Sequence, residues 1–471
     1  AVIFCSFPFH IWYTLSQYSR ILTRIPYLDP VLFVDKLECV LLLIMIVGLI
    51  LRSVGKALTI FCGVFLVYPF VSKWLPGILY YKGMSFEKMV DLLIMGNSGI
   101  YGQAAGAGSG FLYWIMIFGA LFATLGGGDV LIDLGMKLGA KAKDNSGPAK
   151  AAVVASGLMG MISGSAAANV AGTGVITIPM MKQVGYTPEE AGAIESCAST
   201  GGQIMPPIMG AAAFLMAEYA STPYSTIAVK AIIPAFLYFS GVFIAVHLEA
   251  KKTGLKGLSK EHLPKFFQTL FTKGYLLVPL IALVIFILKT TMAMAAIIGT
   301  LLAIVVSLFR KETRITPSKF FDALQDTAKS TLTVGAACAV AGMIACVITT
   351  TGIGTKLISA IVGLAGGNLF IAMFLTMVTC IILGMGVPTT ANYVIMATTC
   401  APILVNGMGI NKIAANMFVF YFGIVADITP PVALAAYAGS AIAGSRPMKT
   451  ALNATSLAIA AFIVPYCFGL N

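Results

Sequence analysis

The sequence predicts an all-α polytopic membrane protein built around an inverted repeat, and two observations lead to this fold class. The chain of 471 residues is 59% hydrophobic and only 10% charged, whereas soluble domains carry roughly 25% charged residues. Two stretches, 160–216 and 384–440, also match each other without a gap and are interrupted at the same places. Paired, interrupted apolar segments in two halves indicate a secondary transporter and the position of its binding site.

Apolar runs that reach or approach the roughly 20 residues needed to cross a bilayer predict membrane-spanning helices. The run 275–309 is long enough for a hairpin of two spans that turns near Lys289, Thr290 and Thr291. None of the runs alternates polar and apolar residues as the strands of a β-barrel would. The predicted spans lie in 38–51, 57–72, 110–125, 226–248, 275–309, 332–350, 369–383 and 450–468.

The net charge of +12 is typical of a membrane protein whose cytoplasmic loops are rich in lysine and arginine. No basic face interleaved with aromatic residues lies outside those loops, which argues against nucleic-acid binding. The basic loops are 137–150, 251–273 and 310–319, and the positive-inside rule places all three in the cytoplasm. The hairpin 150–190 then enters from the cytoplasm and the hairpin 369–408 from outside, which gives the two copies opposite orientations.

Two amphipathic stretches, 130–143 and 355–366, precede the hairpins and follow similar glycine-containing segments. Each is expected either as an arm that lies along the membrane interface or as a kinked continuation of the preceding span.

Cysteine, histidine and known catalytic motifs give no sign of an enzyme or a metal protein. The nine cysteines have no CxxC spacing and are expected as small core residues. The histidines His10, His247 and His262 are far apart in the sequence and suggest no metal site. The chain contains no HExxH, GxSxG or Walker lysine motif, so neither intramembrane catalysis nor ATP hydrolysis is expected.

The matched interruptions are predicted to be helix breaks inside the membrane. They are Gly201-Gly202-Gln203-Ile204-Met205-Pro206-Pro207 and Ala426-Asp427-Ile428-Thr429-Pro430-Pro431, and glycine and proline both interrupt the helical hydrogen-bond ladder. The hairpin tips, Ser163-Gly164-Ser165 and Pro388-Thr389-Thr390, are expected at the same depth. Such breaks must face protein or a wet cavity, where carbonyls can bind a cation and N–H groups an anion. Close helix packing by small residues is the alternative explanation.

Asp427 is the most informative ionisable residue, because it lies in an apolar run beside a Pro-Pro pair. A carboxylate inside a membrane is a functional-site candidate that can bind a cation or carry a proton. Gln203 occupies the matching position in the first copy. Glu195 lies about one helical turn from the cytoplasmic end of its segment, so a snorkelling or structural role is expected for it.

Several segments together resemble the large membrane subunit of TRAP (tripartite ATP-independent periplasmic) transporters. The segments QIMPPIMGAAAF and AVHLEAK (245–251) are most similar to the fused-permease branch that works with TAXI-type binding proteins. The resemblance covers about 85–471, with repeats at about 105–250 and 325–471. Residues 1–80 resemble the C-terminal part of a fused small subunit, and the first part of that subunit is expected to be missing from this chain. The matching segments are GGxDxLIDL near 126–134, KAAVVASGLMGMISGSAAANV at 150–170, STGGQIMPPIMGAAAFLMAEY at 199–219, GMGVPTTANYV at 384–394 and DITPPVALAAYA at 427–438.

This resemblance implies a secondary transporter of a small carboxylate in the bacterial inner membrane. A soluble periplasmic protein would deliver the substrate, and a gradient of Na⁺, or of H⁺ in some TAXI-type systems, would drive uptake. The implied fold is an elevator, with a fixed scaffold and a transport domain built from the two re-entrant hairpins and the two broken helices. No cofactor other than the coupling ion is implied.

The resemblance also implies two cation sites, each at a hairpin tip and the adjoining break, with the substrate between them. The first cation site falls on Ser163, Gly164, Ser165, Gly201, Gly202, Met205 and Pro206. The second falls on Pro388, Thr389, Thr390, Asp427, Thr429 and Pro430. The substrate site falls on Ser165, Asn169, Gln203, Thr389 and Asn392.

Three other functions remain open from the sequence. One is a proton-coupled TRAP permease, and another is a free-standing inverted-repeat symporter of dicarboxylate and cation that needs no binding protein. The third is a channel, which requires a continuous polar lining, and no charged ring is evident in the sequence.

Overall fold

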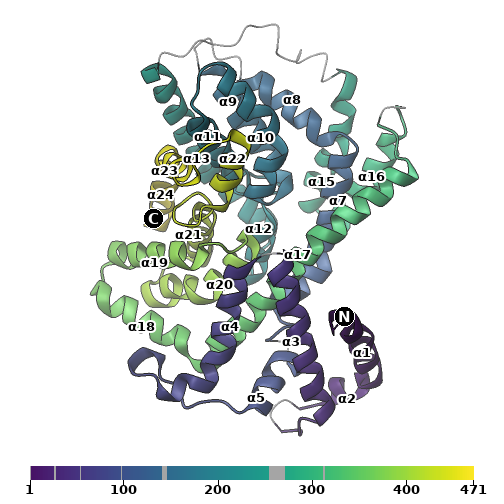
Figure 1. Ribbon diagram of the computed structural model, residues 1–471, viewed down its shortest axis with the longest axis vertical. Coiled ribbons are helices and arrows are strands. Elements are labelled where there is room, and N and C mark those ends of the chain that lie inside the picture. The colour runs from purple at the N-terminus through teal and green to yellow at the C-terminus, as the bar shows by residue number, and fades with distance from the viewer. Residues whose placement is uncertain are drawn as a thin grey trace.

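The computed structural model describes residues 2–25, 28–53, 55–96, 98–139, 146–253, 271–310 and 313–470. These residues form helices and no strand (Figure 1), which confirms the all-α class for the described part of the chain. Parts of two predicted basic loops, 140–145 within 137–150 and 254–270 within 251–273, lie outside the described residues. The membrane orientation derived from those loops therefore stays a prediction.

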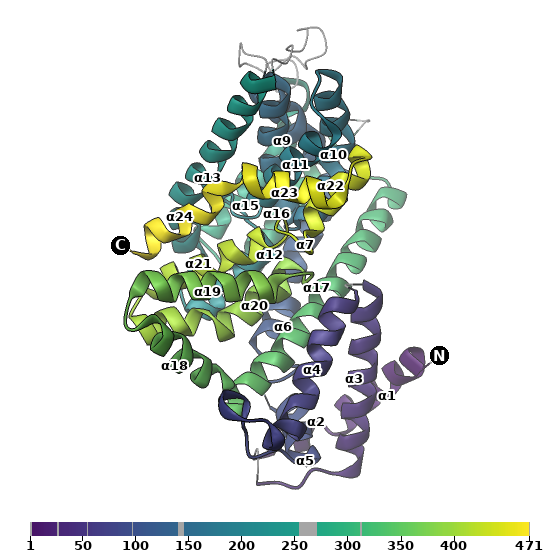
Figure 2. The ribbon, with the colours of Figure 1, turned by 60° about the vertical axis from the view of Figure 1, so that its left-hand side comes forward.

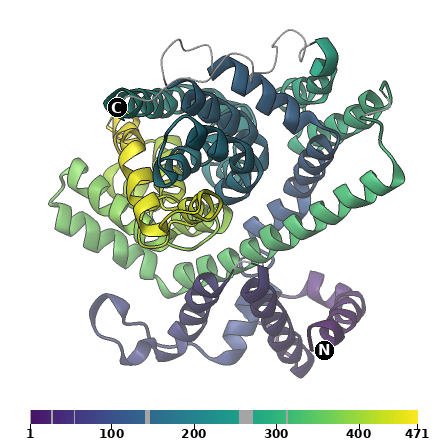
Figure 3. The same cartoon turned by 45° about the horizontal axis from the view of Figure 1, so that its top comes forward.

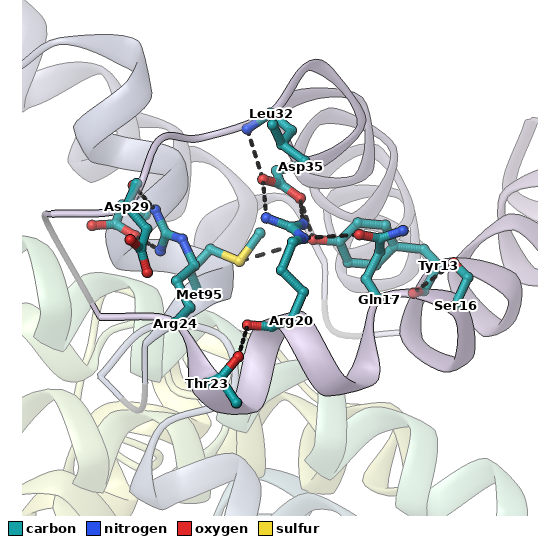
Figure 4. Close-up of polar contacts among 11 residues, drawn as sticks. Tyr13, Ser16, Gln17, Arg20, Thr23, Arg24, Asp29, Leu32, Asp35 and Met95 are labelled. Carbon is teal, nitrogen blue, oxygen red and sulfur yellow. Dashed lines mark hydrogen bonds and ion pairs between the residues drawn. The ribbon is translucent and has the colours of Figure 1, made fainter.

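The N-terminal helices lie together at one end of the molecule, at the bottom of Figures 1 and 2. Their charged side chains link them to one another and to the following segment (Figure 4). Buried Asp35 accepts a hydrogen bond from the Tyr13 hydroxyl at 2.7 Å and pairs with Arg20, and Arg24 pairs with Asp91. The elements are α1 (Val2–Ser16), α2 (Tyr18–Thr23), α3 (Phe33–Ser53), α4 (Lys56–Val71), η1 (Ser72–Trp74), η2 (Gly77–Leu79), α5 (Phe86–Val90) and the π-turn η3 (Asp91–Met95).

Two series of helices with the same order of elements follow. The first consists of α6 (Gln103–Ala107), the π-turn η4 (Gly108–Leu112), α7 (Tyr113–Thr124), α8 (Gly127–Gly139), α9 (Gly147–Ser163), α10 (Ala166–Gln183), α11 (Pro188–Gly202), α12 (Ala211–Ala220) and α13 (Tyr224–Thr253). The second consists of α17 (Pro317–Thr351), α18 (Ile353–Ala365), α19 (Leu369–Gly384), α20 (Thr389–Thr399), the π-turn η7 (Ile403–Gly407), α21 (Lys412–Val425), α22 (Leu434–Ala443), α23 (Pro447–Leu457) and α24 (Ile459–Gly469).

An antiparallel helix pair connects the two series, as predicted for 275–309. It consists of η6 (Gly274–Leu277), α15 (Val278–Ile287) and α16 (Met292–Ser307). The hydroxyl of Thr291 accepts a hydrogen bond from the Met294 N–H and so caps α16. Four described helical segments are long and apolar enough to cross a membrane, or five if the bent pair α23 and α24 is counted as one span.

The two amphipathic stretches form separate helices, α8 and α18. Gly126 (φ +90°) precedes α8 and Gly352 (φ +69°) precedes α18, and this left-handed backbone conformation ends a helix. Both stretches are thus separated from the preceding span by a break, and the choice between an interfacial arm and a kinked continuation stays a prediction. α8 packs against α9, and α18 packs against α19.

The second hairpin differs from the first in its turn. Two residues, Gly164 and Ser165, join α9 to α10, whereas the four residues 385–388 join α19 to α20. α19 ends early because Gly386 adopts φ +74° and because Pro388 disfavours a helical conformation in the residue before it. Thr389 and Thr390 therefore form the first residues of α20 at this tip.

The gapless alignment of the repeats is also wrong in one segment. The starts of α10 and α20, residues 166 and 389, are 223 positions apart, whereas Gly185 and Gly409 are 224 apart. The second copy regains its missing residue in the π-turn η7, since such a turn accommodates one extra residue within a helix. Asn169 is thus equivalent to Asn392, and each is the fourth residue of its helix.

Helix α11 lies at the centre of the repeat region, packed against α9, α10, α22 and α23 (Figure 2). The long helix α17 runs diagonally between the N-terminal helices and this region (Figure 3) and contacts α3, α4, α7 and α20. It exceeds the predicted span 332–350 at its N-terminus, where the Thr316 hydroxyl caps the helix and Pro317 occupies its first turn.

Candidate functional site

The structure interrupts both helices where the sequence predicts breaks, and it closes the two breaks in the same way. Helix α11 ends at Gly202 and α12 begins at Ala211, while α21 ends at Val425 and α22 begins at Leu434. The carbonyl of Gln203 accepts a hydrogen bond from the Gly210 N–H, and the carbonyl of Asp427 accepts one from the Ala435 N–H, both at 2.9 Å.

Side chains of the protein supply hydrogen bonds that the interrupted backbone lacks. The hydroxyl of Tyr224 donates to the carbonyl of Pro207 at 3.0 Å, and the hydroxyl of Tyr437 donates to the carbonyl of Pro431. Thr455 donates to the carbonyl of Ile428 at 3.0 Å. A backbone carbonyl without a partner in lipid would cost several kcal/mol, so these hydroxyls make the breaks tolerable.

We predict that Tyr224→Phe lowers the stability of the protein by about 1 kcal/mol, the typical net value of one hydrogen bond. Thermal unfolding of the detergent-purified protein measures the effect. Tyr219→Phe is the matched control, because the Tyr219 hydroxyl makes no hydrogen bond to another described residue. Equal melting temperatures for Tyr224→Phe and the unchanged protein would show that this hydrogen bond does not support the break.

A cavity of about 740 Å³ lies between the hairpin tips and the helices α3, α7 and α17. The first tip contributes Ser163, Gly164 and Ser165, and the second contributes Pro388, Thr389 and Thr390. Asp427 also lines the cavity. The structure therefore brings seven of the predicted site residues to one hollow, and polar residues of the surrounding helices join them: Ser53, Asp326, Ser330 and Thr333.

Asp427 is the carboxylate that lines this cavity together with the hairpin tips. Its side chain is 6% exposed, and its Oδ2 accepts a hydrogen bond from the Thr389 hydroxyl at 3.0 Å. Gln203 lies close to the same carboxylate. The residues at matching positions in the two repeats, Gln203 and Asp427, thus meet each other, so the breaks themselves converge on one point.

Two buried asparagines behind the tips present oriented but unused oxygen atoms. The Nδ2 of Asn169 donates to the Ser156 carbonyl at 2.8 Å and to the Ser199 hydroxyl at 3.0 Å, and the Nδ2 of Asn392 donates to the Gly423 carbonyl at 2.9 Å. The Oδ1 atom of each has no hydrogen-bond partner among the described residues, and neither has the amide of Gln203. Buried polar atoms are normally paired, so these oxygens are free to bind a ligand.

The other predicted site residues do not line the cavity. Gly201 and Gly202 are needed for packing, because a Cβ atom at Gly201 would lie 2.3 Å from the Tyr238 ring and one at Gly202 would lie 2.5 Å from the Cα of Gly160. This is the close-packing explanation, and it applies to the first break more than to the second. The residues that do not line the cavity are Asn169, Gly201, Gly202, Gln203, Met205, Pro206, Asn392, Thr429 and Pro430.

Of the two roles expected for Glu195, snorkelling to the membrane surface is wrong, whereas a structural role stays a prediction. Its side chain is fully buried and accepts hydrogen bonds from four hydroxyl groups. The signal was present in the sequence, because Thr173 and Thr177 are spaced by four residues, as are Glu195 and Ser199, which places each pair on one helical face. Three polar residues of α17 that line the cavity, Asp326, Ser330 and Thr333, were not predicted either. Their spacing of four and three residues also places them on one helical face.

Comparison with known proteins decides the family. Residues 41–471 match the family model described as "Tripartite ATP-independent periplasmic transporter, DctM component". The chain belongs to the DctM family. Members of the DctM family are permease components of transporters and not enzymes. The match begins within the segment predicted as the tail of a small subunit, and the boundary near residue 80 stays a prediction.

The chain is also similar to a DctM-type relative from Oleidesulfovibrio alaskensis, the isethionate TRAP transporter permease protein DctMQ. The two share 24% identity over 288 residues, which cover 60% of this chain and 45% of the relative. The chain thus matches less than half the length of that protein.

Proposed function

We propose that this DctM-family chain is the permease of a TRAP system in the bacterial inner membrane that imports a small carboxylate. A TAXI-type periplasmic binding protein delivers the substrate, and a Na⁺ gradient drives its uptake. The observation that carries the proposal is the convergence of both hairpin tips and Asp427 on one cavity. A site shared between two repeats is where secondary transporters bind substrate and coupling ion.

The oxygen atoms around the second tip support Na⁺ as the coupling ion. They belong to a carboxylate (Asp427), to hydroxyls (Thr389 and Thr390) and to backbone carbonyls, and such hard donors suit Na⁺-like cations. Among the described residues, no hydrogen bond reaches the carbonyl oxygen of Pro206 or Pro430. These carbonyls therefore remain available to cations at the two breaks.

The helix N-termini support an anionic substrate. α10 begins directly after Ser165 in the sequence, and α20 begins at Thr389. Ser165 and Thr389 both line the cavity. The first N–H groups of a helix and the positive end of its dipole favour a carboxylate. A volume of about 740 Å³ is in the range of small-molecule sites.

The arrangement of helices around the cavity supports the elevator mechanism that we propose. The hairpins α9–α10 and α19–α20, with the broken helices, form the proposed transport domain. Helices α3, α7 and α17 supply the facing wall and form the proposed scaffold. The TAXI assignment rests on the segments QIMPPIMGAAAF and AVHLEAK.

Uptake into proteoliposomes with the purified binding protein, under separately imposed Na⁺ and pH gradients, tests this function. We expect uptake to require both the binding protein and Na⁺. Uptake driven by a pH gradient alone would favour the proton-coupled permease, and uptake without the binding protein would favour the free-standing symporter. A conductance that needs no gradient coupling would favour the channel.

The double variant Thr389→Ala/Thr390→Ala should raise the Na⁺ concentration needed for half-maximal uptake several-fold, because it removes two hydroxyl donors at the second tip. A Na⁺ titration of the initial uptake rate measures this shift. Thr398→Ala, on the same helix but bonded to the carbonyl of Val394 at 3.0 Å, is the control. An identical titration for the double variant would assign this tip a packing role only.

A further inference from the structure

The cluster around Glu195 is a second polar site, separate from the cavity. Glu195 lies in α11 and is fully buried between α9 and α10. Its Oε1 accepts hydrogen bonds from Ser156 and Thr173 and, at 3.1 Å, from Ser199. Its Oε2 accepts one from Thr177. None of these five side chains lines the cavity, so the roles proposed for the hairpin tips leave the cluster unexplained.

Among the described residues of the helices packed around it, no cation forms an ion pair with this carboxylate. Arg446 and Lys449 approach Glu189 at 3.7 and 3.9 Å, and Lys182 donates to the carbonyl of Ala443 at 2.9 Å. A buried charge without a cationic partner is costly. The hydrogen-bond partners of Glu195 are the four hydroxyls alone among the described residues. The other titratable groups on the surrounding helices α9, α10, α11, α13, α22 and α23 are Lys150, Glu190, Cys197, Tyr224, Lys230, Tyr238, His247, Glu249, Lys251, Lys252 and Tyr437.

The hydroxyls around Glu195 can form hydrogen bonds with its carboxyl group in either protonation state. With the carboxylate ionised, all four can donate to it. With the carboxyl protonated, its O–H needs an acceptor, and Thr173 can accept because its own hydrogen can turn to the Asn169 carbonyl at 2.8 Å. Likewise, the hydroxyl hydrogen of Thr177 can turn to the Thr173 carbonyl at 3.1 Å, and that of Ser156 can turn to the Thr173 hydroxyl at 2.9 Å. Each hydroxyl has one hydrogen and two lone pairs, so the network stays satisfied on rearrangement.

From this arrangement we propose that Glu195 and its four hydroxyl neighbours form a proton-binding site inside the transport domain. The proton adds to a carboxylate oxygen, and the hydroxyl hydrogens of Ser156, Thr173 and Thr177 move to their alternative acceptors. The oxygen spacing fits a proton rather than a metal ion, because the oxygens already lie at hydrogen-bond distances from one another.

The site is connected to the first hairpin through Asn169. Ser199 donates to Glu195 and accepts from the Asn169 Nδ2, while Thr173 contacts both Glu195 and the Asn169 carbonyl. Protonation of Glu195 therefore changes the hydrogen bonds that hold Asn169, one turn behind the cavity-lining Ser165. The consequence for transport, a proton carried or sensed during uptake, rests on the proposed function.

Infrared difference spectroscopy of the whole lipid-reconstituted protein tests the site directly and without substrate. When the pH is lowered, a protonated carboxyl group gains a carbonyl stretch that a carboxylate lacks. We expect a band that titrates reversibly in the unchanged protein, is absent in Glu195→Gln and persists in the control Glu249→Gln, whose side chain is paired with exposed Lys252. Asp427→Asn separates the contribution of the other buried carboxyl group.

A second variant keeps the test decisive if Glu195→Gln does not fold. Thr177→Val preserves shape but removes the donor to Oε2, so the band should persist to higher pH. A spectrum without any component that depends on Glu195, or a band unaltered by Thr177→Val, would overturn the proton site.

Uptake measurements then separate this proposal from the proposed function. Glu195→Gln should abolish the effect of an imposed pH gradient on uptake while Na⁺-driven uptake continues. A pH response that survives Glu195→Gln would contradict the proton site. Absence of uptake by the unchanged protein would instead contradict the proposed function, while the infrared result would still decide the protonation of Glu195.

Discussion

Asp427→Asn is expected to raise the Na⁺ concentration for half-maximal uptake by about tenfold or more. Removal of a side chain that tunes a metal site typically weakens metal binding on this scale. Asp427 is the buried carboxylate at the second break, and it is held toward the second tip by the Thr389 hydroxyl. The amide keeps the shape of the side chain and removes its charge, so attraction to the cation weakens while the fold is retained.

The initial rate of uptake into proteoliposomes, titrated with Na⁺ at constant pH, measures the effect. Asp322→Asn is the matched control, since Asp322 lies on α17 and its recorded partner is the exposed Ser318. Uptake by Asp427→Asn that keeps its full dependence on both Na⁺ and pH would remove Asp427 from the cation site.

Gly202→Ala should destabilise the protein by about 1–3 kcal/mol, the usual cost of overpacking. The new methyl group would lie 2.5 Å from the Cα of Gly160, and because this neighbour is backbone, one of the helices α9 and α11 must move. The displaced helices also carry Ser163 at the first tip and Ser199 beside Asn169, so uptake should fall with stability.

Gly172→Ala is the control for this substitution. Gly172 lies within α10 and has open space where its Cβ would be, so alanine should be neutral or stabilise the helix by up to about 1 kcal/mol. Thermal unfolding of both variants in the same detergent compares them directly. A melting temperature for Gly202→Ala equal to that of Gly172→Ala would show that α9 and α11 tolerate a wider separation.

The sequence was sufficient for the features that depend on local residue chemistry. The helix breaks at 201–207 and 426–431 were predictable because glycine and proline interrupt helices in any context. The pair α15 and α16 was predictable from the length of an apolar run. The convergence of the tips on one cavity was an inference from the repeat, and the structure supports it.

Features that depend on packing were not predictable. Counting residues could not show that η7 restores the register lost at the second tip, because a π-turn depends on tertiary contacts rather than on a local motif. The choice between the two roles expected for Glu195 could not be made, because position along a helix gives depth but not the neighbours of a side chain. The dual role of Gly202, at a break and against Gly160, likewise becomes evident only when α9 and α11 are placed together.

The pairing of Gln203 with Asp427 makes the two halves chemically unequal at their point of contact. One half contributes a neutral amide and the other a fixed negative charge. If one monovalent cation occupies each half, Asp427 neutralises one of them and the other leaves a surplus of one positive charge at the breaks. The other carboxylate of the cavity, Asp326, lies 3.7 Å from Lys329 and adds no net charge. A monoanionic substrate would complete electroneutrality there, so the single difference between Gln203 and Asp427 can set the valence of the cargo.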